Sequence, residues 1–179
     1  MADSLPTGDL RYPVGPFTPV APSASRRAAD IADIAALPEK IRAAVAGLDD
    51  RQLDTRYRPG GWSVRQVVHH VADSHMNGFI RVKLALTEEH PTIKPYDENA
   101  WALLADARLP IEFSLTLLDG LHRRWAEVIA AMSPAHFGRT FVHPEHGRVF
   151  TLDEHTQNYG WHSRHHVAHI TALRTRQGW

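Results

Sequence analysis

The sequence predicts an all-α protein: a four-helix bundle with an extended N-terminal arm and a long connection between its second and third helices. Three observations lead to this expectation. Apolar residues recur at helical spacing in four long segments, these segments do not repeat one another, and most prolines lie outside them. Helices that are apolar along one face must bury that face, and a bundle does so. At 179 residues, the chain is expected to form one domain, residues 1–179.

The first 25 residues are expected to form the extended arm. They contain five prolines and two glycines, a composition that excludes a helix. The first helix is predicted from about Arg26 to Leu48, where apolar residues recur three and four positions apart. Pro38 lies inside this segment, and its missing N–H predicts a kink or a restart there.

The second helix is predicted to begin after Ser63, a natural N-cap, and to run from Val64 to Leu86. Its apolar stripe includes His75. Residues 90–110 contain three prolines and are expected to form a long loop across one end of the bundle. The third helix is predicted from Pro110 to Met132, because proline is favoured at the first helical position.

Residues 141–150 are consistent with either a small β-hairpin or a surface loop. The fourth helix, predicted from Leu152 to Arg176, carries His162 and His166 four positions apart on its apolar face. Two imidazoles at this spacing can bind one metal ion, although ordinary hydrogen bonds could satisfy them as well. His165 lies to one side of that face, and His169 lies near its edge.

Composition narrows the possible chemistry. The chain has no cysteine and 13 histidines, so a transition-metal site must be built from imidazole and carboxylate. Walker-type phosphate loops, the Gly-x-Ser-x-Gly motif, His-Glu-x2-His and Glu-x2-His pairs are all absent. A formal net charge of zero gives no electrostatic reason to expect nucleic acid or a membrane as partner. With no apolar span and no signal-type N-terminus, a cytoplasmic location is expected.

A third metal ligand is expected from the second helix, which carries His69, His70 and His75. Helical periodicity alone favours His75, because it lies in the middle of the apolar stripe. His69 and His70 flank the stripe on opposite sides, so periodicity does not choose between them.

Five segments in chain order resemble the YfiT branch of the DinB-like superfamily: LRYPVGPF, YRPGGWSVRQVVHHVADSHMN, KPYDENAW, HPEHG and WHSRHHVAHI. The resemblance implies a homodimer of four-helix bundles with one divalent transition metal ion per subunit, zinc in the first place and nickel as the alternative. In this family the first ligand lies eight residues after the Trp that opens the second helix, which here is Trp62 and implies His70. The closing His-x3-His motif implies His162 and His166.

The resemblance also implies an activity, that of a metal-dependent hydrolase acting on a small-molecule substrate. Relatives that transfer low-molecular-weight thiols such as bacillithiol or mycothiol give the alternative, and a non-catalytic metal-binding module is a further alternative. Three protein ligands leave an open position for water or substrate. No catalytic residue is indicated; Asp73, one turn after His70, could orient that imidazole or accept a proton, or could simply be solvated.

Overall fold

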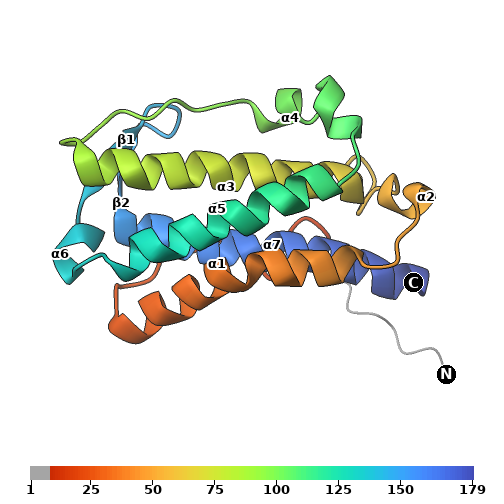
Figure 1. Ribbon diagram of the computed structural model, residues 1–179, viewed down its shortest axis with the longest axis horizontal. Coiled ribbons are helices and arrows are strands. Elements are labelled where there is room, and N and C mark those ends of the chain that lie inside the picture. The colour runs from red at the N-terminus through yellow and green to blue at the C-terminus, as the bar shows by residue number, and fades with distance from the viewer. Residues whose placement is uncertain (1–8) are drawn as a thin grey trace.

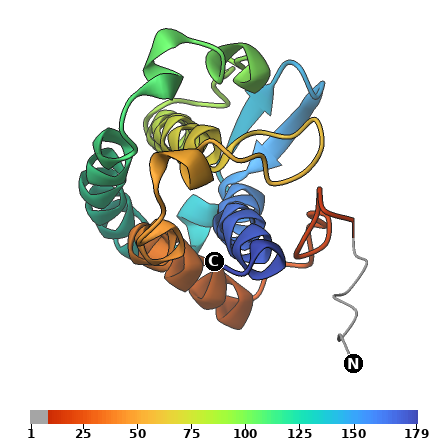
Figure 2. The same cartoon turned by 90° about the vertical axis from the view of Figure 1, so that its right-hand side faces the viewer.

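The computed structural model describes residues 9–179, in which four long helices form a bundle (Figure 1). They are α1 (Ala24–Val45), α3 (Val64–Thr87), α5 (Glu112–Ala130) and α7 (Leu152–Gln177). Helices α1 and α3 each pack against both α5 and α7, so the two lie diagonally opposite each other in the end view of Figure 2. The predicted all-α four-helix bundle is confirmed.

The remaining elements are short: α2 (Asp50–Leu53), α4 (Glu98–Trp101), the 3-10 helix η1 (Ala105–Arg108), α6 (Pro134–Phe137), β1 (Thr140–His143) and β2 (Arg148–Thr151). The two strands form an antiparallel hairpin in which Thr140 is opposite Thr151. The connection between α3 and α5, expected to be a loop, therefore contains α4 and η1. It crosses beside α3 in Figure 1.

Residues 9–23 lie beside α7 (Figure 2). Residues 9–23 contain turns but no helix, and α1 begins at Ala24, two residues before the predicted start of the helix. The backbone of Val20 exchanges two hydrogen bonds of 3.0 Å with the side chain of Gln157. Farther along α7, Trp161 Nε1 donates to the carbonyl of Gly15 at 2.9 Å. Residues 1–8 of the expected arm lie outside the described residues.

Helix α3 begins as its sequence predicts. The Ser63 hydroxyl accepts a hydrogen bond from the Gln66 N–H at 3.2 Å, and the Gln66 side chain accepts one from the Ser63 N–H at 3.0 Å. This reciprocal capping box satisfies two donors that the first helical turn would otherwise leave free. Ser63 is therefore confirmed as the N-cap.

Helix α1 continues through Pro38, so the restart expected there does not occur. Proline has no N–H to donate to the carbonyl of Ile34, four residues earlier. Instead, His122 on α5 places its Nδ1 2.7 Å from that oxygen and donates to it. The carbonyl that the proline leaves without a partner is thus satisfied from a neighbouring helix.

Two apolar clusters fill the bundle, one around Val68 and Ile170 and the other around Phe79 and Trp125. Five histidines lie where one cluster gives way to the other: His70 and His75 on α3, His122 on α5, and His162 and His166 on α7. Burying polar side chains in such a position is costly unless they find partners. The layer of histidines therefore needs an explanation beyond packing.

Helices α3 and α7 approach each other closely beside this layer. A Cβ atom added at Gly78 would lie 2.4 Å from Cζ of Tyr159 on α7, so only glycine leaves room for that ring. The Tyr159 hydroxyl donates to the Ser74 carbonyl at 2.8 Å. These contacts fix the height and the spacing of the two helices at the level of the histidines.

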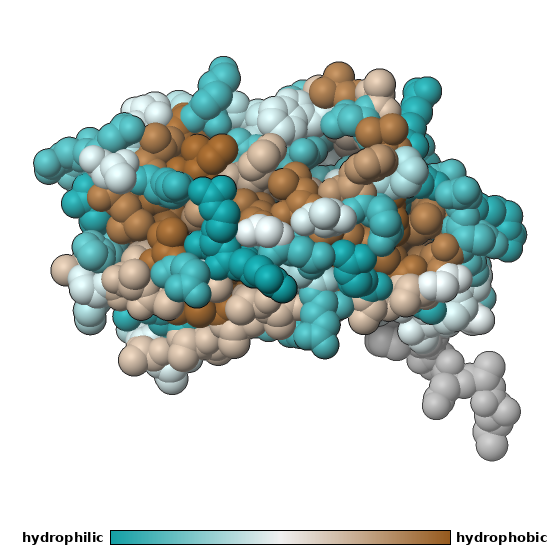
Figure 3. All heavy atoms as spheres, in the orientation of Figure 1, coloured by the Kyte–Doolittle hydropathy of each residue, from teal (hydrophilic) through white to brown (hydrophobic). Residues whose placement is uncertain are grey.

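The outer face formed by α3 and α5 carries apolar side chains among polar ones (Figure 3). Ile80, Phe113 and Leu117 are all exposed, Phe113 by 63%. Among the helices of residues 9–179, none combines the length and the apolar character that a membrane span requires.

The contact between His122 and the Ile34 carbonyl is testable by a double-mutant cycle. We expect His122→Phe to destabilise the protein by about 1 kcal/mol less in a Pro38→Ala background than in the natural sequence. The reason is that an alanine in place of Pro38 supplies the N–H that the Ile34 carbonyl then accepts. Urea unfolding of the four proteins measures the difference, and an equal cost of His122→Phe in both backgrounds would contradict the assignment.

Candidate metal centre

The rings of His70, His162 and His166 come together between α3 and α7. One ligand-capable nitrogen from each ring lies within 4.8 Å of the other two. The ring centroid of His166 is 4.4 Å from that of His162 and 4.9 Å from that of His70. His166 is buried, whereas His70 and His162 are partly exposed to solvent.

Within residues 9–179, His70 is the only one of the three α3 candidates that joins this group. His69 faces elsewhere: its Nδ1 is 2.7 Å from the Ser114 hydroxyl, and its Nε2 is 3.1 Å from the Leu109 carbonyl. His75 is fully buried, as its place on the apolar stripe predicted, but it lies behind the group. Its Nε2 is 3.0 Å from Nδ1 of His162.

A second histidine also stands behind His166. Nδ1 of His169 is 3.3 Å from Nδ1 of His166, and Nε2 of His169 is 3.1 Å from the carbonyl of Arg11 in the N-terminal arm. The ring of Tyr57 stacks on His169 at 3.9 Å. No role was predicted for His169 from the sequence, although its position one turn after His166 on the same helix was a signal.

A second group of three nitrogens within 4.8 Å consists of His165, His166 and His169, all of them buried. His165 stacks on Trp161 at 4.2 Å, and its buried Nδ1 finds no hydrogen-bond partner among the described residues. The two groups share His166.

Burial keeps the rings of the first group neutral. It lowers the pKa of His70 to about 4, with a smaller contribution from the charge of His169. Burial likewise lowers the pKa values of His162 and His166 well below the ordinary value, and the neighbouring histidines act in the same direction. Neutral imidazole is the form that binds a metal ion.

Asp73 is the one acidic residue of α3, one turn after His70. Burial raises its pKa to about 6, with a smaller contribution in the same direction from the charge of Asp106. A carboxyl group with this pKa exchanges protons close to neutral pH, which suits a general acid or base. The ring of Trp62 lies 4.4 Å from that of His70, centroid to centroid.

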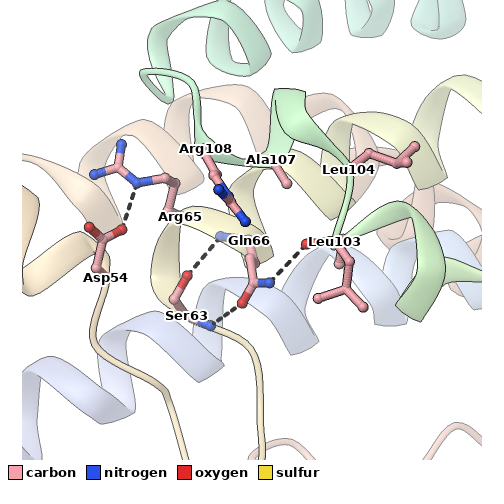
Figure 4. Close-up of a pocket in the computed structure, with 9 residues that line it drawn as sticks. Asp54, Ser63, Arg65, Gln66, Leu103, Leu104, Ala107 and Arg108 are labelled. Carbon is pink, nitrogen blue, oxygen red and sulfur yellow. Dashed lines mark hydrogen bonds and ion pairs between the residues drawn. The ribbon is translucent and has the colours of Figure 1, made fainter.

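A separate pocket of about 360 Å³ lies at the first turn of α3 (Figure 4). Several of its polar groups are paired with one another. Gln66 Nε2 donates to the Ala102 carbonyl at 2.8 Å, and Arg65 forms an ion pair with Asp54 at 2.7 Å. None of the described residues that line it is a histidine, so this pocket is distinct from the histidine groups.

Known proteins resemble the chain over nearly its whole length. A protein of Bacillus mycoides strain KBAB4 named "Putative metal-dependent hydrolase" is 52% identical over 173 residues, which cover 96% of this chain and 99% of that protein. A protein of the same name from Bacillus cereus strain B4264 is 51% identical over 172 residues, with the same coverage.

One solved structure agrees with the fold. YfiT from Bacillus subtilis, described as "a probable metal-dependent hydrolase with an unusual four-helix bundle topology", superposes with a TM-score of 0.92 and 47% identity, covering 95% of this chain and 98% of that one. The sequence model of the DinB superfamily matches residues 33–170. The resemblance found in the sequence motifs is therefore confirmed, and the chain belongs to the YfiT-type branch of the DinB superfamily.

Proposed function

We propose that this protein is a hydrolase of small molecules that depends on a metal ion held by His70, His162 and His166. The observation that carries the proposal is the convergence, within 4.8 Å, of three neutral imidazoles from two helices, two of which are partly exposed to solvent. The names of the Bacillus relatives support it, although they state no reaction.

The residues present fit a divalent transition metal. Imidazole nitrogen is a common ligand of zinc and also of nickel, and we take zinc as the first choice and nickel as the alternative. On His162 and His166 the Nδ1 atom faces another histidine, which leaves Nε2 for the ion. When bound, such an ion would supply Lewis acidity and would lower the pKa of a water ligand to about 7.

The number of ligands favours catalysis over a structural role. Structural zinc sites are usually closed by four protein ligands, whereas catalytic sites have three and keep one position open. Within residues 9–179, the group comprises three histidines and no carboxylate. The bundle also has an apolar core of its own, made of two clusters on either side of the histidines. A domain that depends on a structural metal ion for folding usually lacks such a core.

Thiol transfer is the second candidate function. The same three neutral ligands and open position can bind a thiolate, and the chain contains no cysteine that could provide one. The thiol would therefore come from a low-molecular-weight cofactor of the bacillithiol or mycothiol type. The small-molecule substrate, the homodimer and the cytoplasmic location stay predictions.

Metal analysis tests the proposed ligands. We expect one equivalent of zinc or nickel in the wild-type protein and in His69→Ala, and loss of most of the metal in His70→Ala, His162→Ala and His166→Ala. His69 is the matched control, because it is the buried neighbour of His70 but bonds to Ser114 and Leu109 instead. Full metal content in any of the three ligand variants, measured by elemental analysis, would contradict the assignment.

A paired activity screen tests the reaction. We expect the metal-loaded protein to hydrolyse members of a panel of esters, amides and lactones, and the His70→Ala variant to fall to the background rate, because the metal and its open coordination position are lost. The same preparations are tested for conjugation of monochlorobimane with bacillithiol, mycothiol and glutathione. Conjugation without hydrolysis would replace the proposal by thiol transfer.

If neither activity appears, a large fall in melting temperature on metal removal would instead identify the non-catalytic module, since the binding energy of a structural ion is folding energy.

A further inference from the structure

We propose that His75 and His169 are positioning residues of the metal centre. Each holds one of the two α7 ligands, His162 or His166, in the orientation and the tautomer that metal binding requires. This inference rests on the proposed function, because it takes these two histidines as ligands. Outer partners of this kind usually are carboxylates, backbone carbonyls or waters, and here both are histidines.

The first link joins His162 to His75. A neutral His162 that gives Nε2 to a metal carries its proton on Nδ1, which then donates to Nε2 of His75 over 3.0 Å. The ring of His75 is fixed by its surroundings: it is fully buried, edge-on to Tyr159 at 4.9 Å and stacked on His122 at 5.0 Å. The ring of His75 can therefore fix the orientation of the His162 ring without changing its own position.

Packing alone does not account for a histidine at position 75. Its Nδ1 atom is buried and finds no hydrogen-bond partner among the described residues. A buried polar atom without a partner lowers stability, and an apolar side chain of similar shape would avoid that loss. What the histidine supplies in return is the acceptor for His162.

The second link joins His166 to His169, and a backbone carbonyl sets its direction. The carbonyl of Arg11 can only accept, so Nε2 of His169, 3.1 Å away, carries the proton. Nδ1 of a neutral His169 is then an acceptor, and it faces Nδ1 of His166 at 3.3 Å. His166 must donate from Nδ1, which leaves its Nε2 lone pair for the metal.

The N-terminal arm thereby becomes part of the centre. The carbonyl of Arg11 ends a chain of hydrogen bonds that runs through His169 to His166. The arm is held in place a few residues later, where Trp161 donates to the carbonyl of Gly15. Burial keeps both outer partners uncharged, so they would orient the ligands without placing a negative charge behind a bound metal ion.

The shared ligand limits these two histidine groups to one ion. The second group, His165, His166 and His169, has His166 in common with the first group. A neutral imidazole offers one nitrogen lone pair, so His166 serves one ion at a time. The two groups therefore compete for His166 and are not filled together by neutral ligands.

Zinc affinity of full-length variants, measured by competition with a chelator, tests the inference. We expect His75→Phe and His169→Phe to bind zinc roughly 10- to 100-fold more weakly than the wild type. His75→Gln and His169→Asn, whose amide oxygens replace the lost acceptors near Nε2 and Nδ1, should recover part of the affinity. His155→Phe is the control, because His155 is a buried histidine of α7 that bonds to the Gly78 carbonyl instead.

Each outcome decides a different point. Absence of metal binding by the wild-type protein would contradict the proposed function. A wild-type protein that binds one ion, with folded His75→Phe and His169→Phe variants of equal affinity, leaves the proposed function intact and overturns this inference. Affinity that falls equally in His155→Phe would also overturn it, because the effect would then be one of general destabilisation.

Proton NMR of the cobalt-substituted wild-type protein covers the case in which the variants do not fold. The ring N–H protons of metal-bound histidines are shifted far from the other signals by the paramagnetic ion. We expect two of them, from His162 and His166, to exchange slowly with solvent because they are donated to buried rings, and the third, from the partly exposed His70, to exchange fast. Fast exchange of all three would contradict the proposed links.

Discussion

The antiparallel contact between α3 and α7 is the constraint on which the rest of this structure depends. Gly78 lets Tyr159 into the interface, and the Tyr159 hydroxyl fixes the two helices at one height. At that height His70 lies beside His166, and His75 lies beside His162. The low pKa of the buried imidazoles keeps them uncharged, which is the state in which several histidines can share one interior and also the state in which they can bind a metal ion.

The sequence predicted the helices well because their signals are local. The apolar periodicity and the Ser63 cap lie within the segments they describe, and the structure confirms both. Of the two alternatives expected at Pro38, a kink or a restart, the restart does not occur. The contact that compensates for the proline is not local, because the partner of the freed Ile34 carbonyl is His122, 88 positions away in the sequence. The short helices α4 and η1 were missed because they contain only four residues each, too few to show a period.

The site was harder to predict than the fold. A helical pattern gives the direction of a side chain around its own helix axis, and this put His162 and His166 on one face correctly. It does not give the rotation of α3 against α7, and for that reason periodicity pointed to His75 and left His69 and His70 undecided. The contact between His169 and the carbonyl of Arg11 joins residues 158 positions apart. The residue pattern within one helix therefore cannot predict it.

The central claim is that three imidazoles, and no other side chain, hold one ion and leave a position open. X-ray absorption spectroscopy of the protein loaded with one equivalent of zinc tests it most directly, because the spectrum reports both the number and the kind of ligands. We expect three imidazole nitrogens at about 2.0–2.1 Å together with one or two oxygen ligands that an added small anion displaces. A zinc ion coordinated by four histidines, or by fewer than three, would contradict the claim.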